Sequence, residues 1–465
     1  MAQLAGLEHL LLCPTPHVHN PTHTMNTGLD FLIAAKRCEL AELTQLAHTS
    51  ELVHTTGKLV HALQRERGLS NLALATAAQA NPEPGVHNAL QHQIAESLGL
   101  ERALRRSFDG QHTQRMPHGQ SARLFSRMAY VLHGLDALPA LRLHVVDRDW
   151  TGAQVTAAYV KLVAGLLSVV FEAADSASDP AISRTLVALF NLMQGKEFAG
   201  QERATGSALL AAGSTNGAAQ QQLKYLIESQ DRCFQVFHDF APTPVRNRAR
   251  QQENAHTLAE LERLRRIVCT AQDGAALDRG LGPAWFACCT QRMDDLRAVE
   301  EHLAHDLLIQ CGTQMAAAQR ELDTWDTLAC QPPTTPTLAA NPQGDFFATP
   351  HTPFGPRSYT LARGGLSPTD DPAHPSLARS VLDLVHDQSQ RLQAMEAELD
   401  TVRASLSERK VIERAKGLLM AHRQLGEDEA HKLLRQTAMA QNRRLVDVAE
   451  AVLSMAHVLP HTHLR

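Results

Sequence analysis

From about residue 27 to residue 330, nearly the whole chain repeats apolar residues at the spacing of an amphipathic α-helix. Turn-forming residues interrupt the pattern, for example at Asn81-Pro82, and Thr151 and Asp179 stand where helix N-caps are expected. The pattern predicts helices over residues 27–47, 50–80, 86–108, 120–137, 152–177, 181–212, 217–240, 254–272 and 283–329. Helices of this length form one large bundle or two packed bundles, so the predicted fold class is all-α.

The composition also favours helices over sheets. Aromatic residues make up 4% of the chain, whereas Leu and Ala, both strong helix formers, are abundant. The 465 residues are enough for two or three domains with a substantial core. Because the formal net charge is −5, any contact with nucleic acid must be local.

Three segments lie outside the helical pattern. Residues 1–26 are rich in His and Pro and predict a disordered extension, and Met25, just before the helical pattern begins, is a candidate start of translation. Residues 331–376 hold ten of the 22 prolines and predict a flexible or semi-extended linker. Residues 458–465 form a short tail. The main helical domain is therefore predicted to span residues 27–330.

An apolar seam follows the linker. Its residues alternate at spacings of four and three, which is typical of a coiled coil. They are Val381, Val385, Gln388, Leu392, Met395, Leu399, Val402 and Leu406. The segment 377–404 is therefore predicted to be a coiled-coil helix that joins two copies of the chain. A helix packed on its own chain is the alternative.

The segment 405–457 predicts three short helices, over residues 405–421, 427–441 and 444–456. Basic residues gather on the first of them. Five Lys or Arg lie from Arg409 to Arg423, opposed there by Glu413 alone. A helix face of this kind either binds phosphates or is simply solvated. Charge alone does not decide between these two interpretations.

The order of residues in this segment resembles the ANTAR family. The resemblance runs from Arg409 through Ile412-Glu-Arg-Ala-Lys-Gly417 and continues to Ala449. The family implies a three-helix domain that binds paired stem-loops in leader transcripts and prevents a terminator from forming. Such RNA is held by contacts to phosphates and to unstacked loop bases. The resulting RNA-binding candidates are Arg409, Lys410, Arg414, Lys416, Arg423, Arg443 and Arg444.

Three arginines upstream, Arg67, Arg203 and Arg292, lie on apolar helical stripes, and Arg65 lies at the margin of the first stripe. A guanidinium in such a place needs a partner, because an unpaired buried charge is costly. One possible partner is a small planar anion, which the guanidinium fork fits well. The other is a carboxylate, such as Glu66, Glu197, Glu202 or Asp295.

The stretches that hold these arginines resemble the nitrate- and nitrite-sensing (NIT) family. They are residues 59–69, 196–206 and 285–294, within a likeness that spans about residues 27–328. The family implies an all-helical sensor of two bundles, with nitrate or nitrite held by arginines between helices. The resemblance assigns Arg67, Arg203 and Arg292 as ligand clamps. Arg65 is a further candidate, because it stands beside Arg67 with one residue between them.

Together the two resemblances imply a nitrate- or nitrite-responsive regulator of transcription antitermination, acting on genes of nitrate assimilation. Anion binding is expected to release the basic C-terminal face, which then binds hairpins in leader RNA. The expected partners are this RNA, the anion and a second copy of the chain. The alternatives are a sensor of another small ligand with the same output, and a sensor whose tail contacts a protein.

Other classes of protein are less compatible with the sequence. Its eight Cys residues form no C-x-x-C pair, which indicates reduced thiols in the cytoplasm. We find no signal peptide and no apolar run of about 18 residues. No catalytic loop or elbow motif is present, and His302 and His305, near Glu301 and Asp306, are ligand-like without a counterpart on another helix. We therefore expect a cytoplasmic regulator that is not an enzyme and has no metal, cofactor or membrane contact.

Overall fold

The computed structural model describes residues 28–76, 84–113, 121–329 and 377–456. Within these residues the regular elements are α-helices and one short 3-10 turn, and a lone β-bridge joins Ser214 to Ala276. The prediction of an all-α fold is confirmed. The predicted extension (1–26), the linker (331–376) and the tail (458–465) lie outside the described residues.

The chain divides into two compact units, residues 1–41 with 317–390 and residues 42–316 with 391–465. In the first unit, the start of helix α2 (Gly28–Thr76) packs on the end of helix α10 (Gly282–Ala329). The apolar contact is made by Leu29, Leu32, Ile33, Leu322 and Trp325. Lys36 is fully buried there and forms ion pairs with Glu39 and Glu321.

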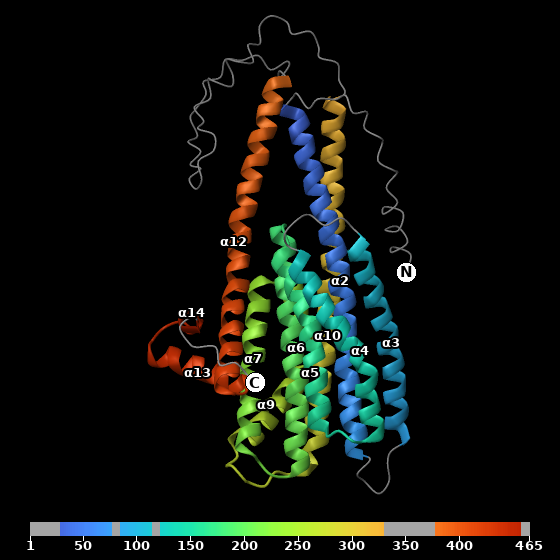
Figure 1. Ribbon diagram of the computed structural model, residues 1–465, viewed down its shortest axis with the longest axis vertical. Coiled ribbons are helices and arrows are strands. Elements are labelled where there is room, and N and C mark those ends of the chain that lie inside the picture. Colours follow the sequence, from blue (N-terminus) through green and yellow to red (C-terminus); the bar gives the residue numbers. More distant parts are fainter. Residues whose placement is uncertain (1–27, 77–83, 114–120, 330–376, 457–465) are drawn as a thin grey trace, which may run out of the picture. The chain divides into compact units, whose positions relative to one another are not determined.

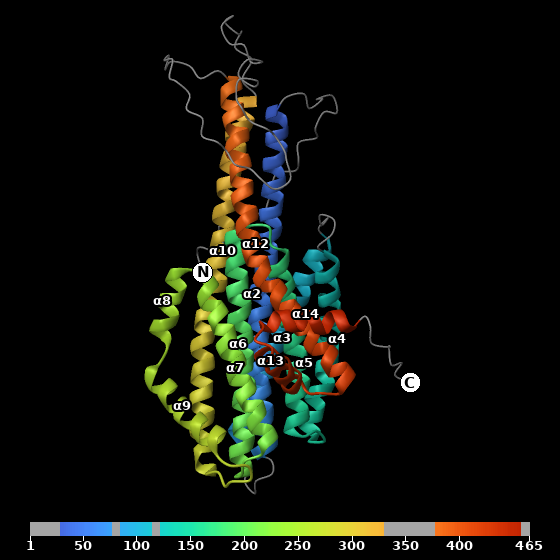
Figure 2. The ribbon, with the colours of Figure 1, turned by 90° about the vertical axis from the view of Figure 1, so that its left-hand side faces the viewer.

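The second unit contains most of the helical core. Its helices are α3 (Pro84–Thr113), α4 (Ser121–Asp147), α5 (Gly152–Ser176), α6 (Pro180–Ala212) and α7 (Gly217–Phe240). Helices α4, α5, α6 and α7 pack on one another in chain order (Figures 1 and 2). The shorter α8 (Thr243–Gln252), α9 (Ala255–Thr270) and η1 (Arg279–Leu281) lie between α7 and α10 in the sequence. Helix α6 is the most buried of these, because α5 and α7 cover it from either side.

Two predicted N-caps fix the starts of the central helices. The Thr151 hydroxyl accepts a hydrogen bond from the Gln154 backbone N–H at 3.3 Å, and the Gln154 side chain accepts one from the Thr151 N–H at 2.8 Å. Asp179 Oδ1 accepts from the Ile182 N–H at 2.8 Å. Both caps satisfy backbone donors that a helix otherwise leaves free, so α5 and α6 begin where the sequence predicts.

Two predicted helix breaks are wrong. Helix α2 runs unbroken through residues 47–50, where Thr49 and Ser50 donate their hydroxyl hydrogens to the helix's own carbonyls at Gln45 and Leu46 and do not cap a new helix. The segments predicted separately as 377–404 and 405–421 form one helix, α12 (Leu377–Arg423). Helix α4 also continues past the predicted end at residue 137, with Pro139 inside it on an exposed face.

The C-terminal part of the second unit folds on the end of α12. Helices α13 (Glu427–Ala440) and α14 (Leu445–Ala456) pack on each other (Figure 2). Their small core with α12 consists of Ala415, Leu434, Ala438, Val448 and Ala449. Along the predicted coiled-coil seam, Leu399, Val402 and Leu406 are already buried in this single chain, whereas Leu392 is 55% exposed.

One described helix, α5, is long and apolar enough to cross a membrane. Most of its apolar stretch is buried inside the protein. A core helix of a globular protein has the same composition, so this feature is accounted for by packing between α4 and α6.

Candidate anion site and basic C-terminal face

Glycines on α2 and α6 make room for the arginines singled out in the sequence. A Cβ atom at Gly200 would lie 2.5 Å from Arg67 Nη2, and one at Gly68 would lie 2.8 Å from Arg203 Nη2. A Cβ at Gly206 would lie 2.1 Å from the Trp285 ring. All three separations are too short for a real side chain. The glycines of these motifs therefore let α2, α6 and α10 approach each other around two guanidinium groups.

Arg67 has a carboxylate partner. It is 1% exposed, and its Nη1 and Nη2 donate to the two oxygens of Glu197 at 2.6 and 3.2 Å. Gln64 donates to the same carboxylate at 2.9 Å. This bidentate pair balances the charge of Arg67 with a carboxylate, which is one of the two kinds of partner that the sequence allows.

Arg203 has no such partner. It is 6% exposed, and no carboxylate of the described residues forms an ion pair with it. Its guanidinium donates to the Thr290 hydroxyl at 3.0 Å and to the Gln64 carbonyl at 3.4 Å, and it lies 4.9 Å from the centre of the Phe286 ring. Burial, together with the positive charge of Arg67, lowers the pKa of Arg203 to about 10. A desolvated cation of this kind gains most from an added anion.

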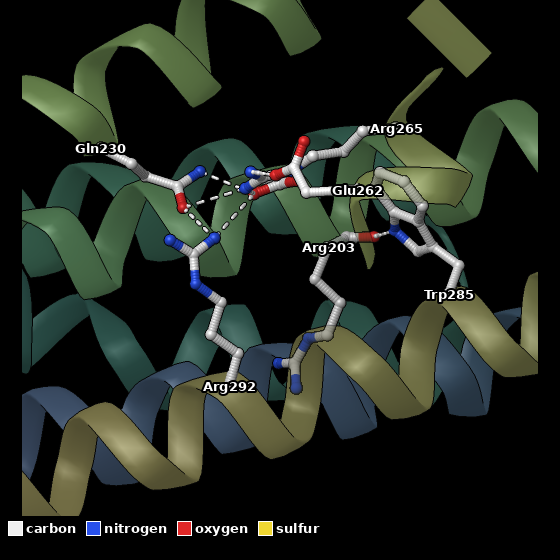
Figure 3. A network of polar contacts seen from close by, with 7 residues as sticks. Arg203, Gln230, Glu262, Arg265, Trp285 and Arg292 are labelled. Atoms are coloured by element: carbon white, nitrogen blue, oxygen red, sulfur yellow. Dashed lines mark hydrogen bonds and ion pairs between the residues drawn. The ribbon is translucent and has the colours of Figure 1, made fainter. Parts of the chain in front are cut away.

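Arg292 belongs to a different network (Figure 3). Its Nη1 donates to Gln230 Oε1 at 2.8 Å and lies 3.9 Å from Glu202, which is already held by Arg265 at 2.6 and 2.7 Å. Figure 3 shows the Arg203 guanidinium pointing away from this network. Burial and the Arg265 charge lower the pKa of Arg292.

The structure thus brings Arg67 and Arg203 together, on the wall of one cleft, and places Arg292 apart from them. Arg65, the fourth candidate, is exposed. Arg265 is a buried arginine that was not among the predicted site residues, although it lies on the buried stripe of α9 with Leu261, Leu264 and Val268. An arginine on an apolar helical stripe is the same sequence feature that marked Arg67, Arg203 and Arg292.

The cleft beside Arg203 has a volume of about 1310 Å³. Its walls come from the end of α2, the start of α5, the second half of α6 and the start of α7, and Phe286 of α10 also lines it. Arg67, Gly68, Gly200 and Arg203 are among the residues that line it. Among the described residues no group of three or more His, Cys, Asp or Glu is arranged to hold a metal ion.

Two of the predicted RNA contacts, Arg409 and Lys410, are held by the helical core within the same unit. Arg409 Nη1 donates to Asn191 Oδ1 at 2.9 Å, and its guanidinium lies 4.7 Å from the Phe190 ring centre. Lys410 Nζ donates to Asp175 Oδ2 at 2.5 Å. We call Arg409 and Lys410 the basic pair.

Aromatic rings line the seat of the basic pair. Lys410 Nζ lies 5.4 Å from the Phe171 ring centre, and Phe171 meets Phe190 edge to face at 5.2 Å. A cation over an aromatic face is attracted by the ring quadrupole, more strongly when it is partly desolvated. Each cation therefore has one oxygen partner and one aromatic face. Lys410 finds both on α5, and Arg409 finds both on α6.

Lys416 does not lie on the exposed face where the sequence placed it. It is 4% exposed and pairs with Glu413 at 2.9 Å and Glu427 at 2.8 Å. Burial acts against the charged amine, but these two carboxylates raise its pKa above the usual value. Glu427 also accepts a hydrogen bond from Tyr225 of α7 at 3.0 Å.

The other basic candidates are exposed on the C-terminal helices. Arg444 is 72% exposed and pairs with Asp447 at 3.0 Å. The remaining exposed side chains are those of Arg414, Arg423 and Arg443. In this structure the basic face is therefore divided into a part that the helical core covers and a part that solvent reaches.

Comparison with known proteins identifies two domains. A model described as nitrate and nitrite sensing (NIT) matches residues 58–308, and the ANTAR domain model matches residues 400–453. The chain is 32% identical over 428 residues to a nitrate regulatory protein of Klebsiella oxytoca, covering 92% of this chain and 95% of that protein. It also resembles the solved structure of the NasR transcription antiterminator, with a TM-score of 0.55 and 29% identity over 93% of this chain and 99% of the other.

Proposed function

We propose that this chain, which belongs to the nitrate and nitrite sensing (NIT) family and carries an ANTAR domain, is a transcription antiterminator that responds to nitrate or nitrite. The anion binds at Arg203, and the ANTAR domain binds paired stem-loops of leader RNA. The observation that carries the proposal is the buried Arg203 guanidinium, which lacks a carboxylate among the described residues while Arg67 and Arg265 each hold one.

The chemistry at Arg203 suits a small planar oxyanion. The guanidinium presents parallel N–H donors that match two oxygens of nitrate or nitrite. The Thr290 hydroxyl oxygen, 3.0 Å from Arg203 Nη1, can donate its hydrogen to the bound anion, in nitrate to the third oxygen. Arg67 lies close enough to add positive potential while its own charge stays paired with Glu197. A monovalent anion therefore balances one cation and leaves the Arg67 pair intact.

The output depends on competition for the basic pair. In the docked state Arg409 donates to Asn191 and Lys410 pairs with Asp175, and both are partly buried, so their contact with RNA phosphates competes with these bonds. Further contacts hold the domain in place, among them Tyr225 with Glu427 and Arg435 with Glu228. The anion acts, in this proposal, by weakening the docked state relative to the free one.

Helix α6 connects the two ends of the proposed switch. It carries Phe190 and Asn191, which hold Arg409, and also Glu197 and Arg203. Twelve residues separate Asn191 from Arg203, so the two lie about 18 Å apart along one helix. A small rotation or shift of α6 on anion binding would reach the seat of the basic pair without passing through the linker.

Calorimetry with nitrate, nitrite, sulfate and chloride tests the sensor. We expect the full chain to bind nitrate or nitrite and Arg203→Ala to weaken this binding by about 10- to 100-fold, the value of a charged hydrogen bond or two. Arg266→Ala, on an exposed face of α9, is the matched control and should bind like the unaltered chain. Equal binding by all three chains would contradict the proposal.

Several finer features belong to the same proposal. The regulator acts in the cytoplasm, on genes of nitrate assimilation, and without a cofactor or enzymatic activity. It forms a homodimer through the part of the α12 seam around Leu392, which its own chain leaves 55% exposed. Binding to a hairpin RNA distinguishes this output from the alternative of a protein partner, since a tail that contacts protein would not bind the hairpin.

A further inference from the structure

The cleft beside Arg203 is far larger than nitrate requires. Its volume of about 1310 Å³ exceeds the roughly 300–1,000 Å³ of most small-molecule sites. A planar ion of four atoms would fill a small fraction of it. The remaining space opens along α5 and α6, whose side chains there are mainly small and apolar.

An alanine wall forms most of this space. Ala153 and Ala157 of α5 face it together with Ala208 and Ala211 of α6, and all four are exposed. Leu72 of α2 adds a larger apolar side chain, 37% exposed, at the same cleft. Such an apolar surface gains free energy when an apolar group covers it.

Two residues that line the cleft also carry a buried polar atom with unfilled hydrogen-bonding capacity. Asn71 Nδ2 donates to Thr156 at 2.8 Å, but the buried Asn71 Oδ1 has no hydrogen-bond partner among the described residues. The buried hydroxyl of Ser207 likewise has none there. The cleft therefore combines the buried Arg203 guanidinium at its inner end, the exposed cation of Arg148 and an apolar wall.

We propose that this cleft binds an amphipathic organic anion, with its carboxylate on Arg203 and its apolar body along the alanine wall. The inference rests on the proposed role of Arg203 as the anion receptor and extends it to a second class of ligand. Because both ligands use the same guanidinium, the organic anion competes with nitrate. Such a molecule fits this cleft because its carboxylate meets a cation at the inner end and its apolar body meets apolar walls further out.

Calorimetry with straight-chain carboxylates from acetate to octanoate tests the proposal on the full chain. Burial of each added methylene should tighten binding by about fourfold until the wall is covered. Octanoate should displace nitrate in a competition titration, and Arg203→Ala should weaken binding of both by about 10- to 100-fold. Affinity that does not change with chain length, or no carboxylate binding at all, would overturn the proposal.

A cavity-filling variant separates the wall from the anion site. Ala208→Phe places a ring in the cleft from an exposed position of α6, so it should remove the gain with chain length and leave nitrate affinity unchanged. Ala137→Phe, at an exposed position of α4 outside the cleft, is the control and should leave both unchanged. Retention of the chain-length gain in Ala208→Phe would refute the placement along the wall. Octanoate binding by the unaltered chain without any nitrate binding would instead refute nitrate as the ligand.

Discussion

Buried arginines in this sensor differ in what balances their charge. Arg67 and Arg265 are each held bidentately by a carboxylate, from Glu197 and Glu202. Arg203 makes two neutral hydrogen bonds and one contact with an aromatic face. A paired guanidinium supports the fold, whereas an unpaired one costs folding free energy unless a ligand completes it. Arg67 and Arg265 should therefore contribute to the stability of the fold, whereas Arg203 should contribute to anion binding.

Replacing each arginine by methionine makes this separation measurable. Arg67→Met leaves Glu197 buried without its cation and should lower the free energy of unfolding by about 3–5 kcal/mol. Arg203→Met removes a desolvated charge and should leave stability unchanged or slightly raised, while nitrate binding is lost. Urea unfolding and calorimetry on the two variants check both values. A larger loss of stability in Arg203→Met than in Arg67→Met would contradict our assignment.

At the scale of elements, the sequence predicts well which helix faces are buried, but it predicts poorly which residues of other helices contact them. Helical spacing placed Arg67, Arg203 and Arg292 on buried stripes, and all three are largely buried. Spacing carries no information on which helix faces a stripe, so it could not tell that Glu197 pairs with Arg67 or that Arg292 faces Gln230.

Side-chain contacts within and between helices also limited what could be predicted from the sequence. The sequence analysis broke α2 at residues 47–50, where Thr49 and Ser50 in fact bond back to the helix. Lys416 looked like part of an exposed basic face, because the approach of Glu427 from the next helix could not be foreseen. Motif resemblance, by contrast, supplied the two domains and their order, which composition and periodicity alone did not.

Contacts between α12 and the helices that hold it set the resting output. Asp175→Asn removes the carboxylate that pairs with Lys410 and should raise RNA affinity in the absence of nitrate. We expect a gain of about two- to fivefold, since a partly exposed ion pair contributes about 0.5–1 kcal/mol. Fluorescence anisotropy with a labelled hairpin RNA measures it.

A matched variant controls for the loss of negative charge. Asp147→Asn removes a carboxylate at an exposed position at the end of α4. It should leave the RNA affinity unchanged. If both variants raise the affinity equally, the effect is one of net charge and the contact between Lys410 and Asp175 does not restrain the domain.

At the scale of the whole molecule, buried histidines make stability depend on pH. Burial lowers the pKa of His54 and of His431 to about 4, and that of His61 to about 2, from 6.5. The folded state therefore keeps these rings neutral, whereas the unfolded chain takes up protons as the pH falls below 6.5. Their stabilising contribution is present above pH 6.5 and is lost as the pH falls toward 4.

Urea unfolding at a series of pH values tests this dependence. The free energy of unfolding should fall steadily from about pH 7 to about pH 5, with the unfolded chain binding more protons. Replacing His61 by Gln removes one of the titrating rings and should make the curve shallower. A stability that is flat over this range, or that rises on acidification, would contradict the account.

The central claim is that an anion at Arg203 controls RNA binding by the ANTAR domain. The most direct test is the affinity of the full chain for a hairpin RNA with and without nitrate, measured at fixed and at several salt concentrations because phosphate contacts depend on salt. We predict that nitrate tightens RNA binding by at least about fivefold in the unaltered chain, within the usual range of coupling between sites. The same titration of Arg203→Met should show no effect of nitrate. RNA affinity that is identical with and without nitrate at every salt concentration would contradict the account.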